Sequence, residues 1–291
     1  MKKIAIYAGL TGILFLFSCK KAEVQNPLSD VKNLSIGAYL TKISTQKSTL
    51  DIFNFKPAEV GVTVNTYGED VDHVVVFMVK GANANPAVWK KVKTIPIVAG
   101  GTKLTVTGAE IITAMGSSDF KPGDYFTFYN QAVTKDGRTF DVSNMPGALE
   151  SNSNYNSLMR WSAYITCPFV SPIAGSYSVV TDDWADWGSG DVVEVTDGPG
   201  ANQINISKVW PNVAYGNVVK PLIVNVDPAT GVASVPKTTF GDYGALASAQ
   251  GAGAGDFAGY ALSCTGDIIL KMTIIYNGSS QGDNKLVLKK L

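Results

Sequence analysis

Histidine is almost absent from this 291-residue chain, in which His73 is the only one. A Ser-His-Asp, Cys-His or histidine-based zinc site would have to use His73. It stands beside the apolar run 74–79, and no nucleophile-elbow motif lies near it. Walker, HExxH and dinucleotide-binding motifs are also lacking, and the glycine-rich stretch 251–255 lacks the Gly-Lys-Ser/Thr ending of a phosphate loop. These absences predict a protein that is not an enzyme. A glycoside hydrolase stays an alternative, because two facing carboxylates would be enough for that reaction.

An excess of charge of one sign is lacking as well. Lys and Arg number 24 and Asp and Glu number 24, so the formal net charge is zero. We therefore expect no nucleic-acid partner, because a phosphate backbone is bound through a cationic surface. Cysteine is scarce, with three residues and no CxxC or Cys/His cluster, so zinc binding and thiol-redox chemistry are not indicated. No cofactor is expected, apart from the calcium alternative described below.

Long apolar runs are lacking except at the N-terminus. Met1-Lys2-Lys3 precedes an apolar run over 4–17, which at about fourteen residues is shorter than a membrane-spanning helix. A cationic start followed by a short apolar run is typical of a secretory signal peptide, here residues 1–18. Its ending, Leu16-Phe17-Ser18-Cys19, resembles the lipobox of bacterial lipoproteins. The resemblance implies cleavage before Cys19 and a lipid anchor on that residue. An ordinary signal peptide that ends at a cysteine is the alternative.

Strand-like patterns fill the rest of the chain and predict an all-β protein. Residues 19–35 are polar and are interpreted as a lipidated tether. Over 36–169, alternating or β-branched runs separated by turns, with one short helix at 109–116, predict an immunoglobulin- or fibronectin-like β-sandwich. Over 170–291, eight strand candidates joined by local turns predict an eight-stranded, lipocalin-like antiparallel barrel. A second sandwich or an open sheet is the alternative. The eight candidates are 176–181, 190–196, 202–209, 221–227, 231–239, 257–264, 267–276 and 284–290.

Small residues dominate the segment 241–256. Such residues bury little apolar area and its glycines lose much entropy on ordering, which predicts a mobile loop at the rim of the barrel. The loop would act either as a lid or as a plain connection. Cys167 and Cys264 remain once Cys19 is assigned to the lipid. Export to an oxidising compartment favours a disulfide between them, and two buried thiols are the alternative.

The densest cluster of aromatic and acidic residues lies in 181–191. Flat indole faces next to carboxylates suit a sugar ring, which has apolar faces and polar edges. Calcium bound by the carboxylates is one alternative, and tryptophans that plug the end of the barrel are another. The predicted ligand-binding residues are Trp184, Trp187, Asp183, Asp186, Trp210 and Tyr215, and the carboxylates available to calcium are Asp182, Asp183, Asp186 and Asp191.

The order of these parts resembles the accessory lipoproteins of Bacteroidota polysaccharide-uptake loci, which include SusE-like proteins. The residues that carry this resemblance are Leu16–Cys19, Lys121–Tyr125, Asp136–Arg138 and Gly175–Tyr177. The resemblance implies a lipid-anchored outer-membrane protein that binds a nutrient, most plausibly a glycan, for a transporter. Lys20 and Lys21 stand where many surface-exported members have acidic residues, so the membrane face is left undecided. A structural or protein-interaction lipoprotein and a lipocalin-like carrier of an apolar ligand are the alternatives.

Overall fold

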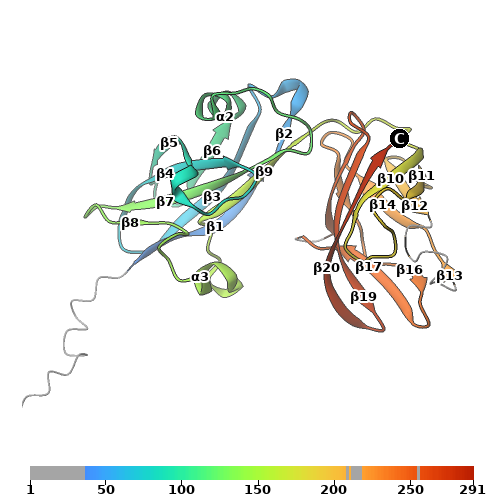
Figure 1. Ribbon diagram of the computed structural model, residues 1–291. Helices are drawn as coiled ribbons and strands as arrows, with labels where there is room; N and C mark the ends of the chain where they lie inside the picture. The colour runs from blue at the N-terminus through green and yellow to red at the C-terminus, as the bar shows by residue number, and fades with distance from the viewer. Residues whose placement is uncertain (1–36, 208–209, 211–217, 254–255) are drawn as a thin grey trace, which may run out of the picture. The chain divides into compact units, whose positions relative to one another are not determined.

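Three antiparallel strands form the smaller sheet in the first half of the chain (Figure 1). The computed structural model describes residues 37–207, 210, 218–253 and 256–291. The sheet has the order β1-β3-β6, with β1 Ala38–Lys47, β3 Glu59–Gly68 and β6 Thr102–Thr107. Val60, Val62 and Val64 alternate along β3 and are buried on one face, as the period of a strand requires.

A second sheet has the order β2-β9-β7-β4-β5, and β8 pairs with β7. Only β2 runs parallel to its neighbour, β9, and the other pairs are antiparallel. At the outer edge, β5 exposes Lys90 and Lys91. The strands are β2 Thr49–Asp51, β4 Val71–Lys80, β5 Lys90–Pro96, β7 Tyr125–Thr134, β8 Thr139–Phe140 and β9 Arg160–Thr166.

Side chains from both sheets belong to one buried cluster. Leu104 of the smaller sheet belongs to it together with Val76, Phe128 and Trp161 of the larger one, and the rings of Phe128 and Trp161 stack with centroids 4.2 Å apart. Aromatic pairs of this kind add to the free energy of folding beyond the area they bury. The immunoglobulin- or fibronectin-like arrangement of these sheets stays a prediction.

Helices are few and short in the described residues. The helix expected at 109–116 is present as α2 (Gly108–Met115), and Gly116 ends it with φ of 70°. Such a left-handed terminal residue is typical of glycine. The other helical turns are α3 Gly147–Ser151 and the 3₁₀ turns η2 Ile52–Asn54, η3 Pro86–Val88 and η4 Ser153–Tyr155. No helix in the described part of the chain is both long enough and apolar enough to cross a bilayer.

Eight strands of the second half close into an antiparallel barrel, as predicted. They pair in chain order, and β20 pairs both with β19 and with the first strand, β10, which closes the ring. Each corresponds to one of the eight candidates in the sequence, although β20 begins earlier than expected and the candidate 231–239 contains both β15 and the start of β16 (Thr238–Asp242). The strands are β10 Gly175–Asp182, β11 Val192–Asp197, β12 Gln203–Ser207, β14 Leu222–Val226, β15 Val232–Ser234, β18 Phe257–Leu262, β19 Asp267–Tyr276 and β20 Ser279–Lys290.

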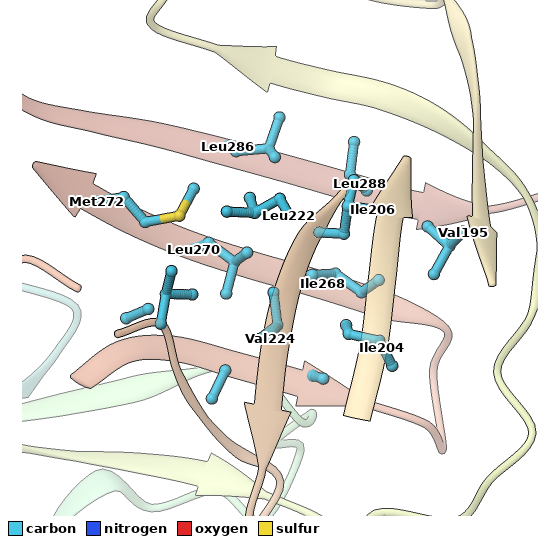
Figure 2. Packing of buried hydrophobic residues seen from close by; sticks show 14 of the residues in the cluster. Val195, Ile204, Ile206, Leu222, Val224, Ile268, Leu270, Met272, Leu286 and Leu288 are labelled. Atoms are coloured by element: carbon cyan, nitrogen blue, oxygen red, sulfur yellow. The ribbon is translucent and has the colours of Figure 1, made fainter. Parts of the chain in front are cut away.

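Branched aliphatic side chains occupy the interior of the barrel (Figure 2). Ile204 and Ile206 on β12 and Leu270 and Met272 on β19 alternate into this core, and each is at most 1% exposed. Leu286 contributes from β20. Eight strands leave an interior that side chains alone are able to fill.

The expectation of a mobile loop over the whole of 241–256 is wrong. Residues Leu246–Gly251 form β17, which pairs with β16 (Thr238–Asp242) on one side and β19 on the other, and β13 (Val218–Val219) pairs with β16. Ala247 and Ala249 are fully buried in the barrel core. Hydrogen bonds to two neighbouring strands and burial of these alanines stabilise β17 despite its small side chains. Residues 254 and 255 lie outside the described residues.

Cys167 and Cys264 form a disulfide. Cys167 directly follows β9, and Cys264 lies in the turn between β18 and β19. Nearby, the backbone N–H of Phe169 donates a hydrogen bond to the carbonyl oxygen of Pro228 at 2.9 Å. Residues Ala38–Leu291 form one compact unit, although no sheet includes strands from both sides of the expected boundary at 169/170.

Candidate functional site

Asp182, the last residue of β10, organises the tryptophan-containing loop predicted to bind a ligand. Its carboxylate accepts hydrogen bonds of 3.1 Å from the backbone N–H groups of Trp184, Asp186 and Trp187 and from the indole Nε1 of Trp210. Burial raises the pKa of this carboxyl above its usual value, although the hydrogen bonds oppose that effect. The carboxylate therefore holds the loop and Trp210 together.

The aromatic side chains of this loop pack onto the core of the barrel. Trp210 is 1% exposed, and Trp184 and Trp187 are partly buried against the same core. Trp184 donates from Nε1 to the hydroxyl of Tyr243 at 3.0 Å, and that hydroxyl donates to Asp186 Oδ2 at 2.6 Å. Burial and the hydrogen bond to Asp186 raise the pKa of Tyr243 far above its usual value. The structure thus favours the alternative in which these tryptophans plug the barrel.

The remaining carboxylates of the loop also have protein partners. Asp183 accepts from the backbone N–H of Lys285 at 3.0 Å, and Asp191 accepts from the backbone N–H of Gly188 at 2.8 Å. Across the described residues, no group of three or more histidine, cysteine or acidic side chains is placed to hold a metal. Tyr215, the last of the predicted ligand-binding residues, lies outside the described residues.

A different group of aromatic residues borders a cavity of about 330 Å³, and the sequence did not reveal it. This cavity, the tyrosine pocket, is lined by Tyr125 of β7, Tyr164 of β9 and Phe257 and Tyr260 of β18. The volume lies within the range of sites for small molecules. A larger hollow of about 410 Å³ beside α2 has no aromatic residue among its described lining residues.

Strand geometry brings the tyrosine rings together. Tyr125 and Tyr164 are directly opposite in the register of β7 and β9, and their rings stack with centroids 5.3 Å apart. The ring of Tyr164 lies 4.9 Å from that of Tyr260, which in turn meets Phe257 edge-on at 5.8 Å. The neighbours Phe126, Ala163 and Ile165 point into the core, so the alternation of both strands sends the tyrosines outward.

The hydroxyl groups of these tyrosines are available to a ligand. Tyr260 is only 5% exposed, yet the described residues provide no hydrogen-bond partner for its hydroxyl, nor for those of Tyr125 and Tyr164. Burial raises the pKa of both Tyr164 and Tyr260, so these hydroxyls stay protonated and able to donate at neutral pH. A hydroxyl that reaches solvent and has no protein partner is free to exchange its water for a hydrogen bond to a polar ligand.

No protein-family model matches this chain. No curated protein matches it either. The chemistry of the tyrosine pocket therefore has to be inferred from its own residues.

The described lining of the pocket suits the binding of a ligand. Lys271 and Lys285 provide its charged groups, and the lining includes no carboxylate, histidine, cysteine or serine. A general acid and a base or nucleophile would both be needed for hydrolysis of a glycoside. His73 is elsewhere, on β4, with its Nδ1 2.7 Å from Asp72 Oδ2.

A sequence signal for this pocket existed, but it was weak. Tyr125, Tyr164 and Tyr260 occupy the outward positions of three strands that are far apart in the chain. An outward aromatic residue on a strand indicates either a covered surface or a binding site. Only the folded chain shows that the three meet.

Proposed function

We propose that this protein is a non-catalytic, membrane-anchored lipoprotein that binds a glycan for an outer-membrane uptake system. The observation that carries the proposal is the tyrosine pocket, where three rings border a cavity and their hydroxyls lack protein partners. The proposal includes a lipid anchor on Cys19, an immunoglobulin-like spacer over 36–169 and a lipocalin-like barrel over 170–291. Cys19 lies outside the described residues.

Sugar chemistry matches the two kinds of surface in the pocket. The C–H face of a pyranose ring packs on an aromatic ring, and its hydroxyls exchange hydrogen bonds with groups at the ring edges. Tyr125 and Tyr164 supply adjacent ring faces, and Tyr260 supplies a hydroxyl that has no hydrogen-bond partner among the described residues. An apolar ligand inside the barrel is less well supported, because buried side chains already occupy that space.

Binding to a glycan panel by the full-length protein in detergent micelles, read by calorimetry and affinity electrophoresis, tests the proposal. Tyr164→Ala removes the central ring and should weaken binding about tenfold or more, as expected when a stacked sugar loses its platform. Tyr260→Phe retains the ring and removes only the hydroxyl, so it should lower affinity without unfolding the chain.

Trp184→Ala is the matched aromatic control. It removes a ring that packs on the barrel core, so it should lower stability while the glycan affinity of the folded fraction stays unchanged. If Trp184→Ala weakens binding and Tyr164→Ala does not, the ligand site is the tryptophan loop that the sequence predicted. If no glycan in the panel binds, the proposed function is wrong.

A second candidate function, a structural lipoprotein of an outer-membrane complex, is favoured by one surface feature. Phe53 is 75% exposed and Val170 is 68% exposed beside a hollow of about 520 Å³ near the disulfide. Solvent-exposed apolar residues at a hollow indicate a contact surface for another protein. Co-purification with a membrane barrel, lost in Phe53→Ser and without glycan binding, would favour this candidate.

A further inference from the structure

We infer that the tyrosine pocket selects acidic glycans, and that Lys271 and Lys285 bind the carboxylate or sulfate group of the sugar. The inference rests on the proposed function, because it names the ligand class of the same site.

The two lysines are neighbours across a strand pair. Lys271 of β19 and Lys285 of β20 are directly opposite in the register, and both are exposed and line the pocket. Their neighbours Leu270 and Leu286 point into the barrel, so the lysines project from its outer face. Like charges directly opposite on a sheet repel each other, and an anion placed between them relieves the repulsion.

Protein carboxylates neutralise this pair only in part. Asp283 Oδ2 lies 3.4 Å from Lys271 Nζ, and both side chains are exposed to solvent, so the ion pair is weak. No ion pair within the described residues includes the ammonium of Lys285. Asp124, which lies beside Tyr125 in the chain, is already paired with Lys80 at 2.7 Å. Asp183 lies beside Lys285, but it accepts a hydrogen bond from the backbone N–H of that residue. The lining itself therefore presents two ammonium groups and no carboxylate.

The other polar groups at the pocket also favour an acceptor-rich ligand. The hydroxyls of Tyr125, Tyr164 and Tyr260 are able to donate hydrogen bonds to a ligand. The described lining contains no carboxylate that would repel an anion. A carboxylate or sulfate attached to a sugar ring has several acceptor oxygens next to an apolar face. Such a ligand would bind the two lysines and accept a hydrogen bond from the hydroxyl of Tyr260 while its ring packs on the tyrosines.

A comparison of matched acidic and neutral polymers tests the inference. The full-length protein in detergent micelles is titrated with polygalacturonate and with its fully methyl-esterified form, which keeps the backbone and removes the charge. Carboxyl-reduced chondroitin sulfate keeps only the sulfate, unsulfated chondroitin keeps only the carboxylate, and unsulfated, carboxyl-reduced chondroitin is the neutral partner of both. This set separates sulfate from carboxylate as the acid group. Binding of an acidic member about tenfold tighter than its neutral partner is expected, with the difference reduced by about 0.5 M salt.

Variants of the two pocket lysines test whether these side chains bind the acid group of the glycan. Lys271→Gln and Lys285→Gln should each weaken binding of the acidic polymer several-fold and leave any neutral polymer unaffected. Lys289→Gln is the control, since Lys289 is an exposed lysine of the same strand that does not line the pocket. Neutral polymers that bind as well as acidic ones, or acidic binding that survives both pocket variants, would overturn the inference and leave the proposed function intact. Absence of binding to all polymers would refute the proposed function itself.

Discussion

Asp182 shows how one residue determines the role of its neighbours. Three backbone N–H groups and one indole N–H converge on its partly buried carboxylate. In the sequence, the same aspartate and the adjacent tryptophans suggest a sugar platform or a calcium site. Composition alone could not distinguish a carboxylate that binds a ligand from one that holds a loop, because the partners of Asp182 include a residue about thirty positions away.

Replacement of Asp182 should therefore affect stability before it affects binding. Asp182→Ala leaves four donors without their acceptor and should lower the free energy of unfolding by about 3 kcal/mol or more, since each buried unsatisfied group costs about 1–3 kcal/mol. Urea denaturation followed by tryptophan fluorescence measures the change. Asp197→Ala, an exposed acid at the end of β11, is the control. Equal stability of the two variants would contradict the role given to Asp182.

At the scale of elements, helix α2 shows how a short sequence motif stabilises the helix that it begins. Thr107 and Glu110 form a capping box, in which each side chain bonds to the backbone of the other residue. Burial alone would raise the pKa of Glu110, but the hydrogen bond from the Thr107 backbone and the nearby Lys93 ammonium lower it overall. The charged carboxylate therefore stabilises the fold.

Removal of either half of this cap should lower stability, and the contribution of Glu110 should depend on pH. Thr107→Ala should lower the free energy of unfolding by about 1 kcal/mol. Because the folded-state pKa of Glu110 is lowered, its contribution is present above the ordinary value of 4.5 and is lost as the pH falls through the folded value. The difference between wild type and Glu110→Gln, measured by thermal unfolding, should therefore shrink below that pH. A difference in stability between the two proteins that grows on acidification would contradict this role of the Glu110 carboxylate.

The strands were predicted correctly where turn residues marked their ends. The prediction failed for 241–256, where small side chains alone were taken to indicate a loop. The turn at Asp227–Gly231 separates β14 from β15, and the eight barrel strands follow from such breaks. In β17, by contrast, Ala247 and Ala249 carry the alternation with side chains so small that the pattern resembles a loop. The tyrosine pocket was missed for a further reason: register between distant strands is a tertiary property.

At the scale of the whole molecule, the disulfide constrains a long loop. Cys167 and Cys264 are 97 residues apart, so the bridge removes much entropy from the unfolded chain. The double variant Cys167→Ala/Cys264→Ala should lose about 2–5 kcal/mol of unfolding free energy, the usual range for such a bridge. Chemical denaturation gives the value, and addition of a reductant to the wild type should reproduce it. Reaction of both thiols with an alkylating reagent in the denatured, unreduced protein would contradict the bridge.

The lysines of β5 have a consequence for the membrane-anchored state that we propose. Anchored molecules are confined to a plane, where a strand with unpaired N–H and C=O groups readily recruits the same strand of a neighbour. Lys90 and Lys91 project from such a strand at the border of its sheet. Two copies that approach border to border therefore repel each other, which in the proposed anchored state would oppose strand-mediated aggregation.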